Sequence, residues 1–278
     1  MALWCSSFQE EDGRITAATT MRFPTTRWNI LKTIKTGDRR SKDQALNEFA
    51  LIYGAPLYAF ARRQTHGTRG PEDCQDFVAG FFLKCVEEDV LTHVDGKIGQ
   101  FRNFLAASFK NHILNVQRAE RAQKRSPEGE VMSIEQLTGD YGSALEPRDS
   151  ETPEDAFLRV LRASTLKRAL VEFRNRCQRA GQTPKYKMFV ARDIAPEGWG
   201  APEPSYEELA ARFDVVSANL ANKIVLAARR EFKQLLLAEV NGDCASEREA
   251  EVECALVLHA NIEPEAEGAV SPVLAKRR

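Results

Sequence analysis

Basic and amide side chains recur along residues 101–125 in a pattern that could bind phosphates. Five of these residues follow one another at steps of seven and then four positions: Asn103, Lys110, Gln117, Arg121 and Arg125. At about 100° per residue, their side chains share one side of a helix. Between positions 97 and 125 the chain has seven Lys and Arg residues and one acid, a net charge of +6. Such a row suits a nucleic-acid backbone, although an ordinary solvated helix face is the alternative interpretation. The candidate contact residues are Lys97, Asn103, Lys110, Gln117, Arg118, Arg121, Lys124 and Arg125.

The opposite side of the same segment is apolar. Its large hydrophobic residues lie three or four positions apart, which is the spacing of one buried stripe on an amphipathic helix. A helix over 101–125 would extend about 37 Å at about 1.5 Å per residue. It could bury its aromatic residues in a core and still present a long basic surface. The stripe consists of Phe101, Phe104, Leu105, Phe109, Ile113 and Val116.

Composition limits the classes of protein to which this chain can belong. Its 278 residues suffice for one or two domains, and 39 Lys and Arg residues balance 40 Asp and Glu residues, so a nucleic-acid surface requires local segregation of charge. The six cysteines form no CxxC pair and do not cluster with the four histidines, which argues against a metal site and favours the cytoplasm. We expect no cofactor, no enzyme activity, no signal peptide and no membrane span.

A second helical segment, over 71–88, precedes the basic one. Pro71 and the acids that follow it are typical of a helix N-terminus. Cys74 and Cys85 fall on an apolar stripe, so we interpret both thiols as small core residues. Asp73 and Asp76 lie on the polar side. Upstream, the periodicity predicts two helices that are separated by a break at 37–38.

The middle of the chain begins with a linker. Residues 126–152 are polar and punctuated by Gly and Pro, which is typical of a linker. Thr152 and Pro153, followed by two acids, then predict a helix that ends near Arg179. We expect 181–204 to be irregular, with a buried apolar segment inside it.

Residues 205–240 are typical of a helix-turn-helix. Ser205 and Glu208 form a capping box for a short helix, and 214–216 form the turn. A second helix begins near Ser217. In DNA-binding proteins of this outline the second helix enters the major groove, while plain helix packing produces the same pattern. Its candidate groove residues are Asn219, Asn222 and Lys223.

Two registers remain open for this second helix. Either Leu220 and Ile224, or Ala221, Val225 and Phe232, could face the core. The choice decides which polar side chains can reach a groove.

The chain ends in an acidic segment. Residues 243–278 contain eight acids and four basic residues, a net charge of −4. One more helix is predicted at 250–259, and we expect the last twenty residues to be disordered. An acidic tail that masks the basic helix is one hypothesis for its role.

Three of these stretches occur in an order that resembles a known family. They read EDCQDFVAGFFLKC at 72–85, GQFRNFLAASFKNHILNVQRAERAQKR at 99–125, and SYEELAARF and AARREFKQLL within 205–236. Their order and spacing resemble the extracytoplasmic-function class of bacterial RNA polymerase sigma factors. The FPTTRW stretch at 23–28 is similar to a subgroup with an unusually long linker.

The resemblance implies a role for each stretch. The 95–100 loop would receive a base flipped from the −10 element, with Asn111 beside that pocket and Phe104 supporting the helix, so Gln100 and Asn111 become candidate DNA contacts. The helix from Ser217 would read the −35 element. Promoter DNA and core RNA polymerase are the implied partners, together with an anti-sigma factor or another regulatory protein. The residues that would dock on the polymerase clamp are Asp73, Asp76, Phe77, Ala79 and Gly80.

Several positions depart from the family pattern. Ala79 stands where the family usually has a glutamine that faces the clamp, and Ala107 replaces a common basic residue. The turn is one residue longer than usual, with Asp214 in place of the turn glycine.

We therefore predict an all-α protein with two helical domains, a region 2-like bundle and a region 4-like helix-turn-helix domain, that acts as a sigma factor. One alternative is a stand-alone helix-turn-helix regulator that binds duplex DNA as a dimer. Another is an interaction module that no longer reads DNA. The predicted boundaries are 1–21, 22–125, 126–152, 153–241 and 242–278.

Overall fold

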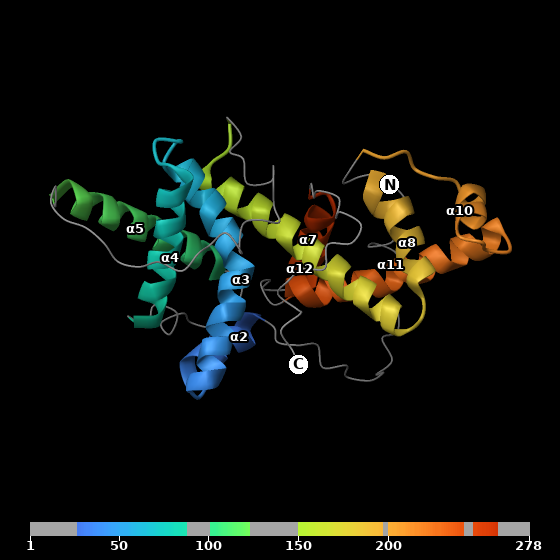
Figure 1. The fold of residues 1–278 in the computed structure, drawn as a ribbon, viewed down its shortest axis with the longest axis horizontal. Helices are drawn as coiled ribbons and strands as arrows, with labels where there is room; N and C mark the ends of the chain where they lie inside the picture. The colour runs from blue at the N-terminus through green and yellow to red at the C-terminus, as the bar shows by residue number, and fades with distance from the viewer. Residues whose placement is uncertain (1–26, 88–100, 123–149, 197–199, 242–246, 261–278) are drawn as a thin grey trace.

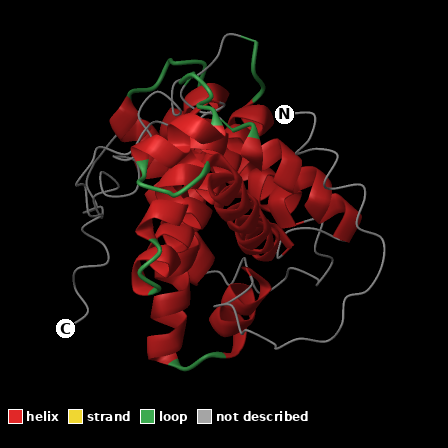
Figure 2. Ribbon diagram, turned by 90° about the vertical axis from the view of Figure 1, so that its right-hand side faces the viewer, coloured by secondary structure: helices red, strands yellow, loops and turns green. Residues whose placement is uncertain are grey.

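The computed structural model describes residues 27–87, 101–122, 150–196, 200–241 and 247–260, and every regular element in these ranges is helical (Figure 2). The described part of the chain is therefore all-α, as predicted. None of its helices is long and apolar enough to cross a membrane. The elements are α2 (Arg27–Thr36), α3 (Arg39–Gln64), α4 (Pro71–Glu87), α5 (Phe101–Ala122), α7 (Pro153–Arg179), α8 (Thr183–Phe189), the π-helical turn η4 (Val190–Ile194), α10 (Tyr206–Arg212), α11 (Ala218–Asn241) and α12 (Glu247–Leu258).

Helices α2 to α5 pack around an aromatic core. The rings of Phe60 and Phe81 lie 5.7 Å and 5.2 Å from the ring of Phe109, both edge to face. Phe101, at the start of α5, meets Tyr53 of α3 in the same way at 5.7 Å. The predicted stripe of α5 therefore faces the core. Its fully buried members are Phe101, Leu105, Phe109 and Ile113, and its half-buried members are Phe104 and Val116.

Helix α7 extends from α3 toward the end of the molecule that holds α10 and α11 (Figure 1). In its first half, Ala156 and Val160 meet Ala55 and Ala59 of α3, and these small side chains allow the two helices to approach closely. In its second half, Phe173 joins a second core that includes residues of α11 and α12. Phe157 and Leu161 of the first half belong to the aromatic core, so this one helix of 27 residues contributes to both cores.

The ends of α7 follow from local sequence. The Thr152 hydroxyl accepts a hydrogen bond from the Asp155 N–H at 3.1 Å, and the Asp155 carboxylate accepts one from the Thr152 N–H at 3.2 Å. At the other end Gly181 adopts φ 66°, and the Gln182 N–H donates to the Cys177 carbonyl at 2.7 Å. The predicted start and end of this helix are confirmed.

The segment after α7 differs from the sequence prediction. We expected 181–204 to be irregular, but α8 and η4 occupy much of it. Pro184 lies in the first turn of α8, where a helix needs no N–H donor, so it begins a helix instead of breaking one. Met188 and Phe189 are fully buried, as expected of the apolar segment. Their tertiary packing stabilises a helix that is too short to be stable alone.

Helix α12 belongs to the second core. The sequence predicts a helix at 250–259, and the structure has one at Glu247–Leu258. Ala250, Cys254 and Val257 are each 1% exposed or less and pack with residues of α7 and α11. The acidic segment after α11 therefore contributes apolar residues to the fold as well as charge.

Candidate nucleic-acid interfaces

The outer face of α5 presents the amide-rich part of the predicted basic surface. Asn103 and Asn111 are exposed. Arg118 is also exposed and donates a hydrogen bond to the side-chain oxygen of Asn115 at 3.2 Å. The remaining predicted contact residues are half-buried (Lys110 and Gln117) or lie outside the described part of the chain (Lys97, Gln100, Lys124, Arg125 and the side chain of Arg121).

Lys110 is paired across the gap between α5 and α7. Its Nζ lies 3.3 Å from Oε1 of Glu154, in the first turn of α7. The two side chains are 44% and 49% exposed, so the pair contributes only about 0–1 kcal/mol. Exchange of the Glu154 carboxylate for another anion at Lys110 therefore costs little.

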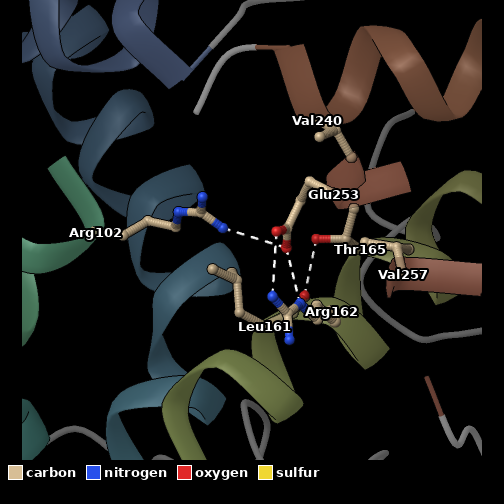
Figure 3. A pocket seen from close by; sticks show the side chains of 7 residues that line it. All are labelled: Arg102, Leu161, Arg162, Thr165, Val240, Glu253 and Val257. Carbon is tan, nitrogen blue, oxygen red and sulfur yellow. Dashed lines mark hydrogen bonds and ion pairs between the residues drawn. The ribbon is translucent and has the colours of Figure 1, made fainter. Parts of the chain in front are cut away.

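A largely buried ion cluster joins the first turn of α5 to α7 and α12. Arg162 donates to the two Glu253 carboxylate oxygens at 2.9 Å and 3.2 Å, and Arg102 Nη1 lies 3.2 Å from Glu253 Oε1. Figure 3 shows both guanidinium groups converging on this carboxylate. The pocket beside them has a volume of about 10 Å³. That volume is on the order of one water molecule, so the cluster is a packed junction and not a ligand cavity.

The Glu253 carboxylate remains ionised in this junction. Burial alone would raise the pKa of Glu253, but the hydrogen bond from Arg162 and the charges of Arg102 and Arg162 hold that pKa below its usual value. Arg102 is therefore occupied by α12 instead of facing outward with the other cations of α5. Glu249 adds a further contact, 3.8 Å from Arg102.

This cluster was not predicted from the sequence. By sequence, Arg102 is one of the cations of the basic segment, and Glu249 and Glu253 are two of the acids of the C-terminal segment. The available signal was the spacing of Glu249 and Glu253, which places both carboxylates on the same side of a helix. Arg102 does not face outward with the other cations of α5, so its pairing with Glu253 leaves the hypothesis that the acidic segment masks the basic surface a prediction.

Helix α4 carries the predicted polymerase-binding acids. Asp76 is exposed. Asp73 is half-buried, where its carboxylate accepts a hydrogen bond from the Gly70 N–H at 3.2 Å and lies 3.9 Å from Arg69. Both carboxylates lie in the first two turns of the helix.

The other predicted docking residues of α4 lie closer to the core. Phe77 is 3% exposed and packs in the first core, so its ring supports the helix instead of offering a contact. Ala79 is half-buried against the same core. A Cβ atom added at Gly80 would lie 3.4 Å from Nε2 of His112, so the glycine marks a close approach between α4 and α5.

Helices α10 and α11 form the predicted helix-turn-helix. The Ser205 hydroxyl accepts a hydrogen bond from the Glu208 N–H at 3.1 Å and completes the predicted capping box. Asp214 adopts φ 54° in the turn, a left-handed conformation that Asp tolerates better than most residues. The Val215 N–H then donates to the Ala210 carbonyl at 2.9 Å, and the Ser217 hydroxyl caps α11 through the Leu220 N–H at 3.2 Å.

The structure selects one of the two registers of α11. Ala221, Val225 and Phe232 are fully buried, whereas Leu220 is 42% exposed. Ala221 and Val225 pack against Leu209 of α10 in a small core of their own. Among the predicted groove residues, Asn219 and Lys223 are exposed and Asn222 is half-buried.

A paired arginine anchors α11 to the preceding segment. Arg229 donates to the two Asp193 carboxylate oxygens at 2.9 Å and 2.5 Å. Asp193 belongs to η4, and the neighbouring Arg192 lies over the ring of Tyr206, 4.7 Å from its centroid. Polar contacts on both sides of η4 therefore hold the helix pair in place.

Within the described ranges, no three His, Cys, Asp or Glu side chains converge as metal ligands. Burial raises the pKa of Cys85 to about 12, and Cys74 is also buried, which agrees with their predicted role as small core residues. No protein-family model, no curated protein and no solved structure matches this chain.

Proposed function

We propose that this protein is an RNA polymerase sigma factor that binds core polymerase, recognises −10 and −35 promoter elements and initiates transcription. One observation carries the proposal. Helix α5, which carries one candidate surface, and helix α10, which belongs to the other, lie at opposite ends of the described structure (Figure 1). A protein that contacts two separate promoter elements needs two such surfaces held apart. The order of the sequence stretches supports the same function.

The outer face of α5 suits the opening of DNA. Extruding a base costs about a few kcal/mol in lost pairing and stacking. Cations that hold the phosphates, and amides that can pair with base edges, offset part of this cost. Asn103 and Asn111 supply exposed amides, and Arg118 supplies an exposed cation. Binding and strand separation are the whole task of this surface, and covalent chemistry would belong to the polymerase.

The acids of α4 suit a protein partner. Asp73 and Asp76 give the first two turns of α4 a negative face, which would repel a DNA backbone and attract a basic protein surface. We assign this face to core polymerase.

A stand-alone helix-turn-helix regulator is the second candidate. The capped α10–α11 pair favours it, because its turn, caps and small core involve no residue of α5. The amide-rich face of α5 argues against it, because a ligand-binding or dimerisation domain does not need such a surface.

A pull-down with bacterial core RNA polymerase, followed by run-off transcription on genomic fragments, tests the proposal. We expect the full chain to bind core polymerase and to yield discrete transcripts. Asp76→Lys should weaken the binding, whereas Asp43→Lys, the same charge change at an exposed position of α3, should not. Absence of binding, with duplex DNA still bound by the protein alone, would favour the stand-alone regulator.

A further inference from the structure

One face of α11 is exposed over several turns. Successive residues of a helix are rotated by about 100° around its axis. By this rule, an arc of roughly 100° on one side of α11 contains Asn219, Leu220, Lys223, Ala227 and Arg230. All five side chains are exposed, so the structure and the helical geometry define the same face. We call these five residues the reading face.

The charge of the reading face suits a polyanion. Residues 217–230 contain no acid. Lys223 and Arg230 are exposed on this face, whereas Arg229 is turned away and paired with Asp193. A helix that brings only cations and neutral groups to a surface complements the negative potential of a DNA groove.

The N-terminal end of this face is also apolar. Val216, in the turn, is 95% exposed, and Leu220, in the first turn of α11, is 42% exposed. In helix-turn-helix proteins the residues at the start of the second helix reach the base edges. The only apolar group that a base pair presents in the major groove is the C5-methyl group of thymine.

We propose that Val216 and Leu220 read thymine through its C5-methyl group, next to Asn219, whose amide can pair with adenine. This inference rests on the duplex-reading part of the proposed function. It names the base that this helix prefers, and it adds two apolar specificity residues to the polar groove residues predicted from the sequence. Lys223 and Arg230 hold the helix on the duplex through phosphates or guanine.

Deoxyuridine provides a direct test, because it differs from thymidine only by the missing methyl group. The full chain, alone and bound to core polymerase, is first used to select binding sites from a duplex library with a randomised central segment. The selected duplex is then synthesised with each thymine replaced in turn by uracil. We expect selected sites that contain thymine, and a loss of affinity of about fourfold for each contacted methyl group.

Matched variants assign the effect to the helix. Leu220→Ala should weaken binding to the thymine duplex and abolish the difference between thymine and uracil at one position. Leu256→Ala is the control, because Leu256 lies on α12 with a nearly equal exposure of 43%. This variant should retain the full difference. Thermal melting of both variants checks that the fold is unchanged.

Three results would overturn the inference: no selected sequence, no uracil effect, or a uracil effect that persists in Leu220→Ala and Val216→Ala. The pull-down decides the sigma-factor proposal separately. Polymerase binding and transcription without a uracil effect would refute only the thymine reading. A uracil effect without polymerase binding would leave the reading intact in a stand-alone regulator.

Discussion

Arg162 of α7 and Glu253 of α12 form a bidentate pair between residues that are 91 positions apart in the chain. The two donor–acceptor distances are 2.9 Å and 3.2 Å. Such pairs are among the strongest and most geometrically specific polar contacts in proteins. The pair holds α12 on α7, and Arg102 extends the junction to α5.

Removing the charge of Glu253 should destabilise the fold. In Glu253→Gln, the largely buried guanidinium groups of Arg102 and Arg162 lose their counter-charge, and the free energy of unfolding should fall by about 2 kcal/mol. Urea unfolding at neutral pH measures this change. Glu249→Gln is the matched control, since that carboxylate is 39% exposed and 3.8 Å from Arg102, and it should cost less than about 1 kcal/mol. Equal losses in the two variants would contradict a special role for Glu253.

The contribution of Glu253 should also depend on pH. The pKa of Glu253 in the folded protein is lower than its value in the unfolded chain, because Arg162 and Arg102 stabilise the carboxylate. Its stabilisation is therefore present above that unfolded value and is lost as the pH falls through the folded pKa. The difference in unfolding free energy between the wild type and Glu253→Gln should stay constant from about pH 7 to pH 5 and shrink at lower pH. A difference that grows on acidification would show that the sign is wrong.

Charge reversal on α5 should change the salt dependence of DNA binding. In Lys110→Glu combined with Arg118→Glu, each lost duplex-phosphate contact should reduce the slope of log affinity against log salt by about 0.9. The measurement is the affinity of the polymerase complex for a promoter duplex at several salt concentrations. Lys32→Glu, at an exposed position of α2, is the control with the same charge change per residue. An unchanged slope in the double variant would remove α5 from the DNA interface.

Truncation of the aromatic residues of α5 should separate core positions from boundary positions. Phe109 is fully buried between Phe60 and Phe81, so Phe109→Ala should lower the free energy of unfolding by about 3–5 kcal/mol. Phe104 is only half-buried, and Phe104→Ala should cost about 1–2 kcal/mol. Thermal or urea unfolding of both variants compares the two losses. A larger loss at Phe104 would contradict the observed orientation of α5.

The amino-acid sequence by itself determined the features with local signals. Thr152 and Ser205 were both predicted to begin helices, and both do; the capping box predicted at Ser205 is confirmed, and the structure has a second one at Thr152. The apolar spacing within 101–125 identified the buried side of α5 without knowledge of its partners. Caps and helical periodicity depend on groups within about one turn of each other, so they can be read along the chain.

Only the tertiary structure decided between alternatives that fit the local sequence equally well. Both registers of α11 fit the sequence, and packing of Ala221 and Val225 against Leu209 selects one of them. Of the acids in the C-terminal segment, Glu253 meets two guanidinium groups because α5, α7 and α12 converge there. Such choices depend on contacts between residues far apart in the chain, which stabilise one arrangement among several that local propensity leaves nearly equal.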